Sequence, residues 1–254
     1  DVQLHLTVAA CDQATTALRS VATDQGFVPG GPASGGFVMM DAETGAILAW
    51  AEAPTYDPNE SLVDVSRALD DEDAVEEAAR RDGLGEAVAF VTTVRPALAY
   101  SRVAKLAVEP GSCQKLVTGI TLLESGHPIA ESYWCAGRAR RGANDYPRCS
   151  HDHENPVNVE AAEEHSCNRF FADLASAMEH FTVHRELFQV WRRRLGIGEP
   201  PAVDLAAARG LYPANLDRGR IRQVAIGQGM TATPLQMVRV AALLQNGHVL
   251  PLPR

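Results

Sequence analysis

The sequence lacks any hydrophobic run that approaches the roughly 20 residues a membrane-spanning helix needs. It also lacks a run of basic residues, because 32 Asp and Glu outnumber 23 Lys and Arg and give a net charge of −9. A polyanionic partner such as a nucleic acid is therefore not expected. Five cysteines are too few for a disulfide scaffold in 254 residues, and their odd number leaves at least one unpaired.

Apolar residues make up 46% of the chain and charged residues 22%, which is enough to bury one sizeable core. Two apolar runs, 37–40 and 47–50, flank a turn containing Asp41 and Gly45, which predicts a β-hairpin. Because both runs are continuously apolar, we expect helices to cover both faces of the sheet. A strand is predicted at 2–6, and helices at 12–21, after 112, at 159–164, at 170–178, at 183–195 and at 234–246.

Residues 64–83 are dense in charges of both signs. A solvated surface helix or insertion explains this segment best, since a fully polar face has nothing to bury. An acidic docking site is the alternative.

Ser112 and Lys115 lie at the start of a predicted helix, directly after Pro110 and Gly111. A serine hydroxyl needs a base within hydrogen-bond reach to become a nucleophile. A lysine three residues later shares its helix face, and burial would lower the lysine pKa towards that of a base. By itself this spacing is also compatible with an ordinary serine cap and a solvated lysine.

Three further motifs follow in order. Ser166-Cys167-Asn168 lies between two predicted helices, and Ile226-Gly227-Gln228-Gly229 precedes Thr233-Pro234-Leu235-Gln236. The last motif predicts a helix start, with Thr233 as the cap, proline at the first position and Gln236 completing a capping box. Ser166 and Asn168 could likewise serve only as helix caps. Ser-x-x-Lys followed by a Ser-x-Asn element is, however, part of the signature of penicillin-binding proteins and β-lactamases.

With these motifs, nearly the whole chain resembles the transpeptidase domain of class B penicillin-binding proteins, in particular the elongation-type penicillin-binding protein 2. The hairpin sequence, with Asp57-Pro58-Asn59 after it, supports the resemblance, as does Phe170-Phe171 after the second motif. Ser101 stands where the family usually has asparagine. The resemblance implies the serine β-lactamase/DD-transpeptidase-like fold, an α/β (α+β) architecture in which helices flank an antiparallel sheet.

The resemblance implies that Ser112 attacks the D-Ala-D-Ala carbonyl of a peptidoglycan stem peptide while Lys115 takes its proton. An acyl-enzyme forms, and the amine of a second stem peptide resolves it into a cross-link. Ser166 would relay protons, and Asn168 would bond Lys115 or the substrate amide. β-Lactams would acylate Ser112. A serine β-lactamase and a non-catalytic scaffold or β-lactam sensor are the rival functions.

Cys135, Cys149, His153 and Cys167 form a second constellation, because thiolate and imidazole are the ligands zinc prefers. The resemblance supports a structural zinc ion held by these four residues, with His151 competing for the place of His153. The alternative is a Cys135–Cys149 disulfide beside a buried free Cys167.

The two remaining cysteines are expected to have no chemical role. Cys113, beside the nucleophile, should contribute to packing, and Cys11 should be a buried free thiol.

The family's third element, Lys-Thr-Gly, does not follow residue 236. We therefore expect a transpeptidase domain over 1–254 that is C-terminally incomplete, with an unpaired edge on strand 37–40 and weak acylation. Further expectations from the resemblance are an N-terminal pedestal domain and an inner-membrane anchor that place the catalytic domain in the periplasm. A glycan synthase and elongation-complex proteins are the expected partners.

Overall fold

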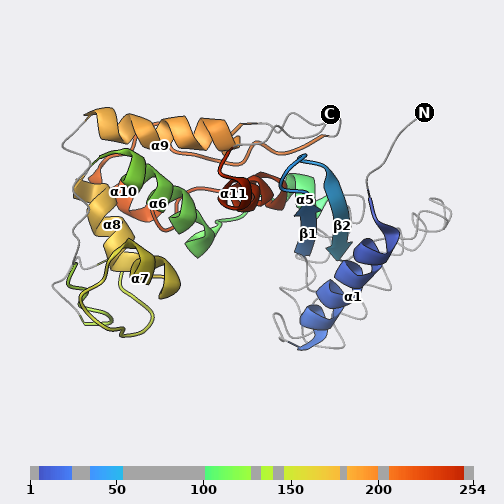
Figure 1. Cartoon of the computed structure of the whole chain (residues 1–254), viewed down its shortest axis with the longest axis horizontal. Helices are drawn as coiled ribbons and strands as arrows, with labels where there is room; N and C mark the ends of the chain where they lie inside the picture. Colours follow the sequence, from blue (N-terminus) through green and yellow to red (C-terminus); the bar gives the residue numbers. More distant parts are fainter. Residues whose placement is uncertain are drawn as a thin grey trace, which may run out of the picture. The chain divides into compact units, whose positions relative to one another are not determined.

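The computed structural model describes residues 6–24, 35–53, 101–126, 133–139, 146–177, 182–199 and 206–248. The chain divides into two compact units, which are described separately (Figure 1). Unit 1 comprises 1–40 and 47–106, and unit 2 comprises 41–46 and 107–254. No helix in the described part is long and apolar enough to span a membrane.

Unit 1 contains the predicted hairpin. Strand β1 (Gly35–Met40) pairs antiparallel with β2 (Ile47–Ala53), and these two strands make up the sheet within the described residues. Helix α1 (Val8–Asp24) packs on β2, whose alanines at 49, 51 and 53 are buried, and the short helix α5 (Arg102–Lys105) packs beside β1 (Figure 1). The hairpin and the first helix are therefore confirmed.

The expectation that both faces of the sheet are covered is wrong for β1. Phe37 and Met39 lie two residues apart, so they share one face of the strand, and they are 40% and 37% exposed. The expected segments 64–83 and 57–59 lie outside the described residues, as do most of the residues of the strand expected at 2–6.

Unit 2 is helical in its described part. A 3₁₀ turn η2 (Gly111–Cys113) leads into α6 (Gln114–Glu124), and α7 (Val159–Glu164) precedes α8 (Asn168–Ala177). Helices α9 (Thr182–Leu195), α10 (Arg218–Val224) and α11 (Pro234–Asn246) follow. All but α10 occupy positions that the sequence predicts.

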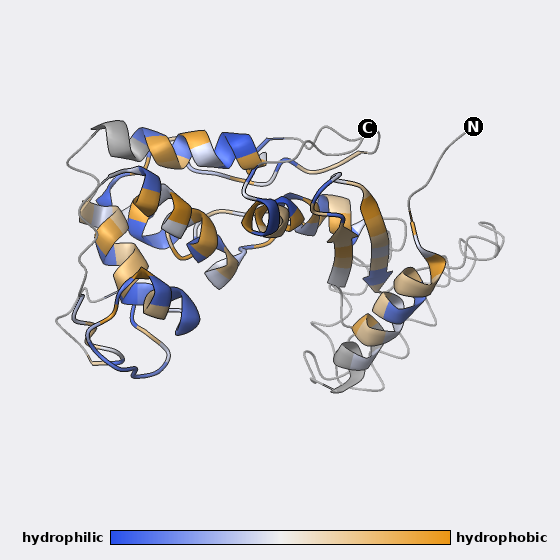
Figure 2. Cartoon of the chain, in the orientation of Figure 1, coloured by the Kyte–Doolittle hydropathy of each residue, from blue (hydrophilic) through white to orange (hydrophobic). Residues whose placement is uncertain are grey.

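The core of unit 2 lies where α6 and α10 pack on α8 and where α9 packs on α6. Their ribbons alternate between hydrophobic and hydrophilic stretches, as expected of amphipathic helices (Figure 2). Phe170 and Phe171 are fully buried on α8 and contact each other edge to face at a centroid distance of 5.3 Å. Removing a buried phenylalanine ring typically costs about 3–5 kcal/mol, so α8 is a firm support for the residues at its N-terminus.

Helix α11 begins and ends as the sequence predicts. Thr233 and Gln236 form the capping box, Pro234 takes the first position, and Gly247 closes the helix in the left-handed conformation. Gln236 also donates from Nε2 to the carbonyl oxygens of Gly196, Glu199 and Arg209, at 2.6, 3.0 and 3.0 Å. The Thr-Pro-Leu-Gln motif is therefore structural, because one buried amide ties α11 to the segments on either side of residues 200–205.

Candidate active site

Ser112 is presented by the turn that starts α6. Gly111 adopts a positive φ of 55° after Pro110, and η2 then places Ser112 at the surface one turn before Lys115. Lys115 is only 1% exposed although it is charged in water. Burial lowers its pKa from 10.5, and electrostatic interactions with Cys149, Cys167 and Glu163 oppose that shift. The amine is thus held in the environment that suits a general base.

Ser166 lies between these two residues. Lys115 Nζ donates to Ser166 Oγ at 2.8 Å and to the Ser166 carbonyl oxygen at 2.6 Å. Ser166 Oγ donates in turn to Ser112 Oγ at 3.0 Å. The three predicted residues therefore form one continuous chain of hydrogen bonds from amine to hydroxyl to hydroxyl.

The backbone at Ser166 is strained. Its φ is +51°, and it is the only non-glycine residue with a positive φ in the described part of the chain. The segment before it ends α7, with Ser166 N–H donating to Glu163 O and Cys167 N–H donating to Ala162 O. A strained residue persists when its surroundings over-determine it, and such residues cluster at functional sites. Here the strain turns the Ser166 hydroxyl and carbonyl towards α6.

Asn168 lies at the start of α8 and donates from Nδ2 to the Arg148 carbonyl oxygen at 2.8 Å. This differs from a bond to Lys115, which was one of the two expected roles of Asn168; the other, a bond to the substrate amide, stays a prediction. The Asn168 amide instead ties the second motif to the loop before it.

The Ile-Gly-Gln-Gly segment supports the turn that carries Ser112. Gly111 N–H donates to Gly227 O at 3.1 Å, and Gly229 N–H donates to Glu109 Oε1 at 2.8 Å. A Cβ atom on Gly227 would lie 2.1 Å from the Gly111 carbonyl oxygen, and Gly227 has a φ of +74°. Only glycine fits at this close backbone approach.

Replacing Gly227 by alanine should destabilise the protein and slow acylation of Ser112. Strain at a positive φ costs about 1–3 kcal/mol, and the contact with Gly111 displaces the turn in addition. Chemical denaturation would measure the loss in the free energy of unfolding, and the rate of penicillin labelling of the folded protein would measure acylation. Gly219→Ala is the matched control, because Gly219 lies within α10 and its added Cβ would approach nothing closer than 3.5 Å. Equal behaviour of the two variants would contradict this role for Gly227.

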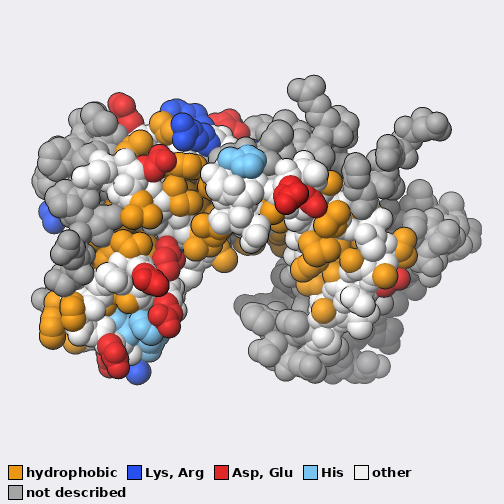
Figure 3. All heavy atoms as spheres, viewed as in Figure 1, with side chains coloured by type: hydrophobic (Ala, Val, Ile, Leu, Met, Phe, Trp, Pro, Cys, Tyr) orange, Lys and Arg blue, Asp and Glu red, His pale blue; other side chains and the backbone are white. Residues whose placement is uncertain are grey.

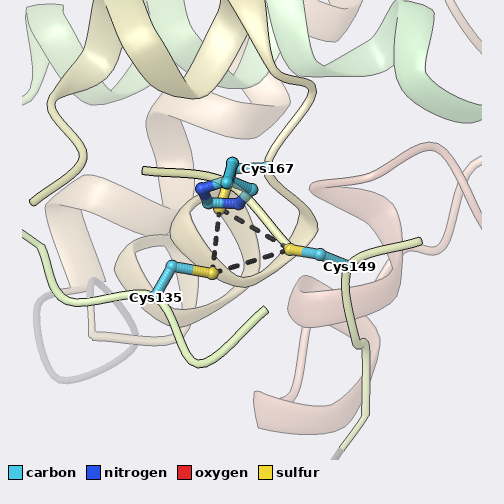
Figure 4. A group of neighbouring side chains, drawn as sticks. Cys135, Cys149 and Cys167 are labelled. Carbon is cyan, nitrogen blue, oxygen red and sulfur yellow. Dashed lines mark hydrogen bonds between the residues drawn. The ribbon is translucent and has the colours of Figure 1, made fainter. Parts of the chain in front are cut away.

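The four predicted metal ligands converge, and Figure 4 shows the three cysteines among them. The sulfur atoms of Cys135, Cys149 and Cys167 form a triangle with sides of 3.7, 3.7 and 3.5 Å. The ligand atoms of these cysteines and of His153 all lie within 4.8 Å of one another. All three thiols are free, so the expected alternative of a Cys135–Cys149 disulfide is not formed. His153, rather than His151, completes the group.

The donor set fits zinc. Tetrahedral ligands at a Zn–S distance of about 2.3 Å place neighbouring sulfurs about 3.8 Å apart, close to the observed triangle. His153 Nε2 is buried and has no hydrogen-bond partner among the described residues, as expected of a nitrogen reserved for another ligand. A hydrogen bond from Cys167 lowers the pKa of the Cys149 thiol to about 4, so this sulfur readily supplies a thiolate.

Arg169 holds the loop that carries Cys135, and no motif in the sequence indicated this role. It is 1% exposed, and its guanidinium donates to the carbonyl oxygens of Gly137, at 3.0 Å, and Ala139. Asn155 adds a pair of hydrogen bonds to the Cys135 backbone at 2.7 and 2.9 Å.

Acidic and histidine side chains gather on the surface around α7 (Figure 3).

Two cysteine predictions need correction. Cys113 is exposed rather than packed, because the turn that presents Ser112 also turns its neighbour outwards. Cys11 is free but half-buried, and its sulfur accepts from the Trp50 backbone N–H at 3.5 Å.

The comparisons with known proteins agree with this geometry. The family model for the penicillin binding protein transpeptidase domain matches residues 35–253. The chain is 27% identical over 238 residues to the peptidoglycan D,D-transpeptidase MrdA of Acinetobacter baumannii, covering 85% of this chain and 31% of that protein. It is 26% identical over 232 residues to PbpA of Mycolicibacterium smegmatis, covering 86% and 42%. The chain thus spans less than half the length of these curated relatives.

Solved structures share the fold. Pseudomonas aeruginosa PBP2 in complex with WCK 5153 aligns with a TM-score of 0.69 at 23% identity, covering 96% of this chain and 51% of that one. The imipenem acyl-enzyme complex of penicillin-binding protein A from M. tuberculosis aligns with a TM-score of 0.67 at 22% identity, covering 96% and 51%. The predicted fold is therefore confirmed.

Proposed function

This chain belongs to the penicillin-binding protein transpeptidase domain family, and from that premise we propose that it carries the acylation centre of a serine-type peptidoglycan D,D-transpeptidase. The observation that supports this most directly is the hydrogen-bonded chain from Lys115 through Ser166 to Ser112. It supplies a nucleophile, a desolvated base and a path for the proton between them.

In the first step, Ser112 Oγ attacks the carbonyl carbon between the two D-alanines of a donor stem peptide. Its proton passes through Ser166 Oγ to Lys115 Nζ, which must be neutral to accept it. Hydroxyl hydrogens rotate freely, so the observed direction of donation can reverse while Lys115 keeps its bond to the Ser166 carbonyl. The C–N bond then breaks, and the departing D-alanine amine takes up a proton.

In the second step, the amine of an acceptor stem peptide attacks the Ser112 ester. A new amide forms, the Ser112 oxygen regains its proton, and the two peptides are cross-linked. The N-terminus of α6 favours the negative charge that develops near Ser112 in both steps. A β-lactam would enter the first step in place of the stem peptide and remain as an ester on Ser112.

Covalent labelling of the full-length protein tests this function against its rivals. A transpeptidase should retain a fluorescent penicillin for many minutes after free label is removed. A β-lactamase would lose the label within seconds, and a non-catalytic scaffold or sensor without a working nucleophile would never take it up. Product analysis with stem peptides should then show a cross-linked dimer that penicillin suppresses.

We further propose that Cys135, Cys149, His153 and Cys167 hold a structural zinc ion. The ion would supply no chemistry to the acyl transfer, but it would fasten the loop after α6 to Cys167, which lies between Ser166 and Asn168. Convergence of the ligand atoms within 4.8 Å supports this assignment. The buried ligands leave a closed site, as in structural zinc centres.

Purified protein should contain about one zinc ion per chain, as measured by elemental analysis. Cys167→Ser should lose most of the metal and lower the midpoint of thermal unfolding, because metal binding contributes folding free energy. Cys113→Ser is the control, since that thiol is exposed and lies outside the group. Metal content that is equal in both variants would reject the site.

The whole protein would act outside the cytoplasmic membrane, where stem peptides are cross-linked, and would work with a glycan synthase during cell elongation. The likeness to the elongation-type relatives supports this assignment. A reporter that is active only after export, fused to the full-length protein, would test the location. Reporter activity without export would contradict it.

A further inference from the structure

Unit 2 contains a cavity of about 320 Å³ lined by Arg138, Tyr146, Arg148 and Cys149. Among the described residues that line it, Arg138 and Arg148 are positively charged, in a chain whose net charge is −9. The cavity is open to solvent, so it can admit part of a larger ligand.

The wall of this cavity is fixed beside the proposed active site. Asn168 of the second motif donates to the Arg148 carbonyl oxygen at 2.8 Å. Arg222 of α10 donates to the Tyr146 carbonyl oxygen from Nη2 and Nε, at 3.0 and 3.2 Å, and pairs with Asp173 of α8 at 2.6 Å. The backbone that carries Arg148 is thereby held at both ends against the helices that carry the site.

The positive charges in the cavity are poorly compensated. The exposed Arg148 guanidinium has no hydrogen bond or ion pair within the described part of the chain. The Arg138 guanidinium approaches Asp152 at 3.8 Å, but the two side chains are 65% and 71% exposed, and such surface pairs contribute little. One Asp152 oxygen is already bonded to the Arg138 backbone N–H at 2.8 Å. The two arginines are therefore available to an external anion.

We propose that this Arg138–Arg148 pocket binds a carboxylate of the donor peptide, on a residue that precedes the D-Ala-D-Ala bond attacked by Ser112. The proposal rests on the proposed function and adds a specificity determinant to it. Guanidinium groups match carboxylates in charge and in their forked geometry. The pocket would thus select donor peptides by a charge remote from the reacting bond.

Two peptide substrates for the full-length protein test this inference, one with free carboxylates and one with the same carboxylates converted to amides upstream of D-Ala-D-Ala. The double variant Arg138→Gln, Arg148→Gln should lower kcat/KM for the acidic peptide about tenfold, mainly through KM, since a charged hydrogen bond is lost. The same variant should leave kcat/KM for the amidated peptide unchanged. Acylation by penicillin, which lacks the upstream residues, should also be unchanged.

Arg193→Gln is the matched control, because it removes one exposed positive charge from α9 rather than from the pocket. Its kcat/KM should equal that of the unaltered protein for both peptides. If the double variant loses kcat/KM equally for both peptides, or loses none for the acidic peptide, the pocket does not bind the carboxylate. Normal penicillin labelling in that case would still support the proposed function. Failure of the unaltered protein to take up penicillin would instead reject the proposed function, and the pocket with it.

Discussion

Replacing Ser112 by alanine is expected to abolish covalent labelling of the full-length protein by penicillin. The Ser112 oxygen is the only hydroxyl that accepts the hydrogen bond from Ser166 in the described part of the chain, and no other group occupies its place in the proton path. Removing the nucleophile leaves no atom to form the ester, so the loss should be complete rather than partial. Intact-mass spectrometry after incubation with penicillin would show the adduct in the unaltered protein alone.

Cys113 is a second nucleophile that could form the adduct, so a variant at this position is the control. Its thiol is exposed immediately beside Ser112, so an added mass could in principle arise from the cysteine. Cys113→Ala should retain the full adduct, because the sulfur has no bond to Lys115 or Ser166 among the described contacts. An adduct that persists in Ser112→Ala but disappears in Cys113→Ala would transfer the nucleophile to the sulfur.

Local sequence signals predicted the elements that hold this site. Thr233 and Gln236 specify their helix start within four residues, and Pro110-Gly111 sets the turn before Ser112. Such signals succeed because each capping contact is made between near neighbours in the chain. The predicted bounds of helix 159–164 are also correct, because its cap is local: the Asn158 side chain accepts from the Ala161 backbone N–H.

Contacts between distant segments were harder to foresee. Ser166 bonds a lysine 51 residues away, and the family resemblance, rather than any local spacing in the sequence, predicts its role as a proton relay. Arg169 would be expected on a surface by its charge, yet it is buried because loop carbonyls accept its donors. The exposure of Cys113 likewise depends on how the turn is oriented, which helical periodicity alone does not determine.

The second motif connects the two proposed centres. Cys167 places its sulfur in the cysteine triangle, while the preceding Ser166 contacts both Lys115 and Ser112. A change in the position of Cys167 must therefore move the strained Ser166 backbone. Loss of the proposed zinc ion should accordingly slow acylation, although the ion would contribute nothing to the chemistry.

Replacing Lys115 by methionine should reduce the rate of acylation by about 10²–10⁴-fold, the usual contribution of a positioned general base. Methionine keeps an unbranched apolar chain in a buried place, so the loss can be assigned to the amine. Lys105→Met is the control, because Lys105 is the only other lysine in the chain and belongs to α5 of unit 1. A Lys115→Met protein that is acylated at the normal rate would remove Lys115 from the mechanism.

The pH dependence of acylation gives a sharper test of Lys115. Only the neutral amine accepts a proton, so the rate should rise with pH through the Lys115 pKa, which burial holds below 10.5. Glu163 lies near this amine, and its negative charge raises the Lys115 pKa. Glu163→Gln removes that charge and should shift the rising limb of the profile to lower pH. Glu164→Gln, on the exposed neighbour, should leave the limb in place, and a limb unmoved in both variants would exclude Lys115 as the titrating base.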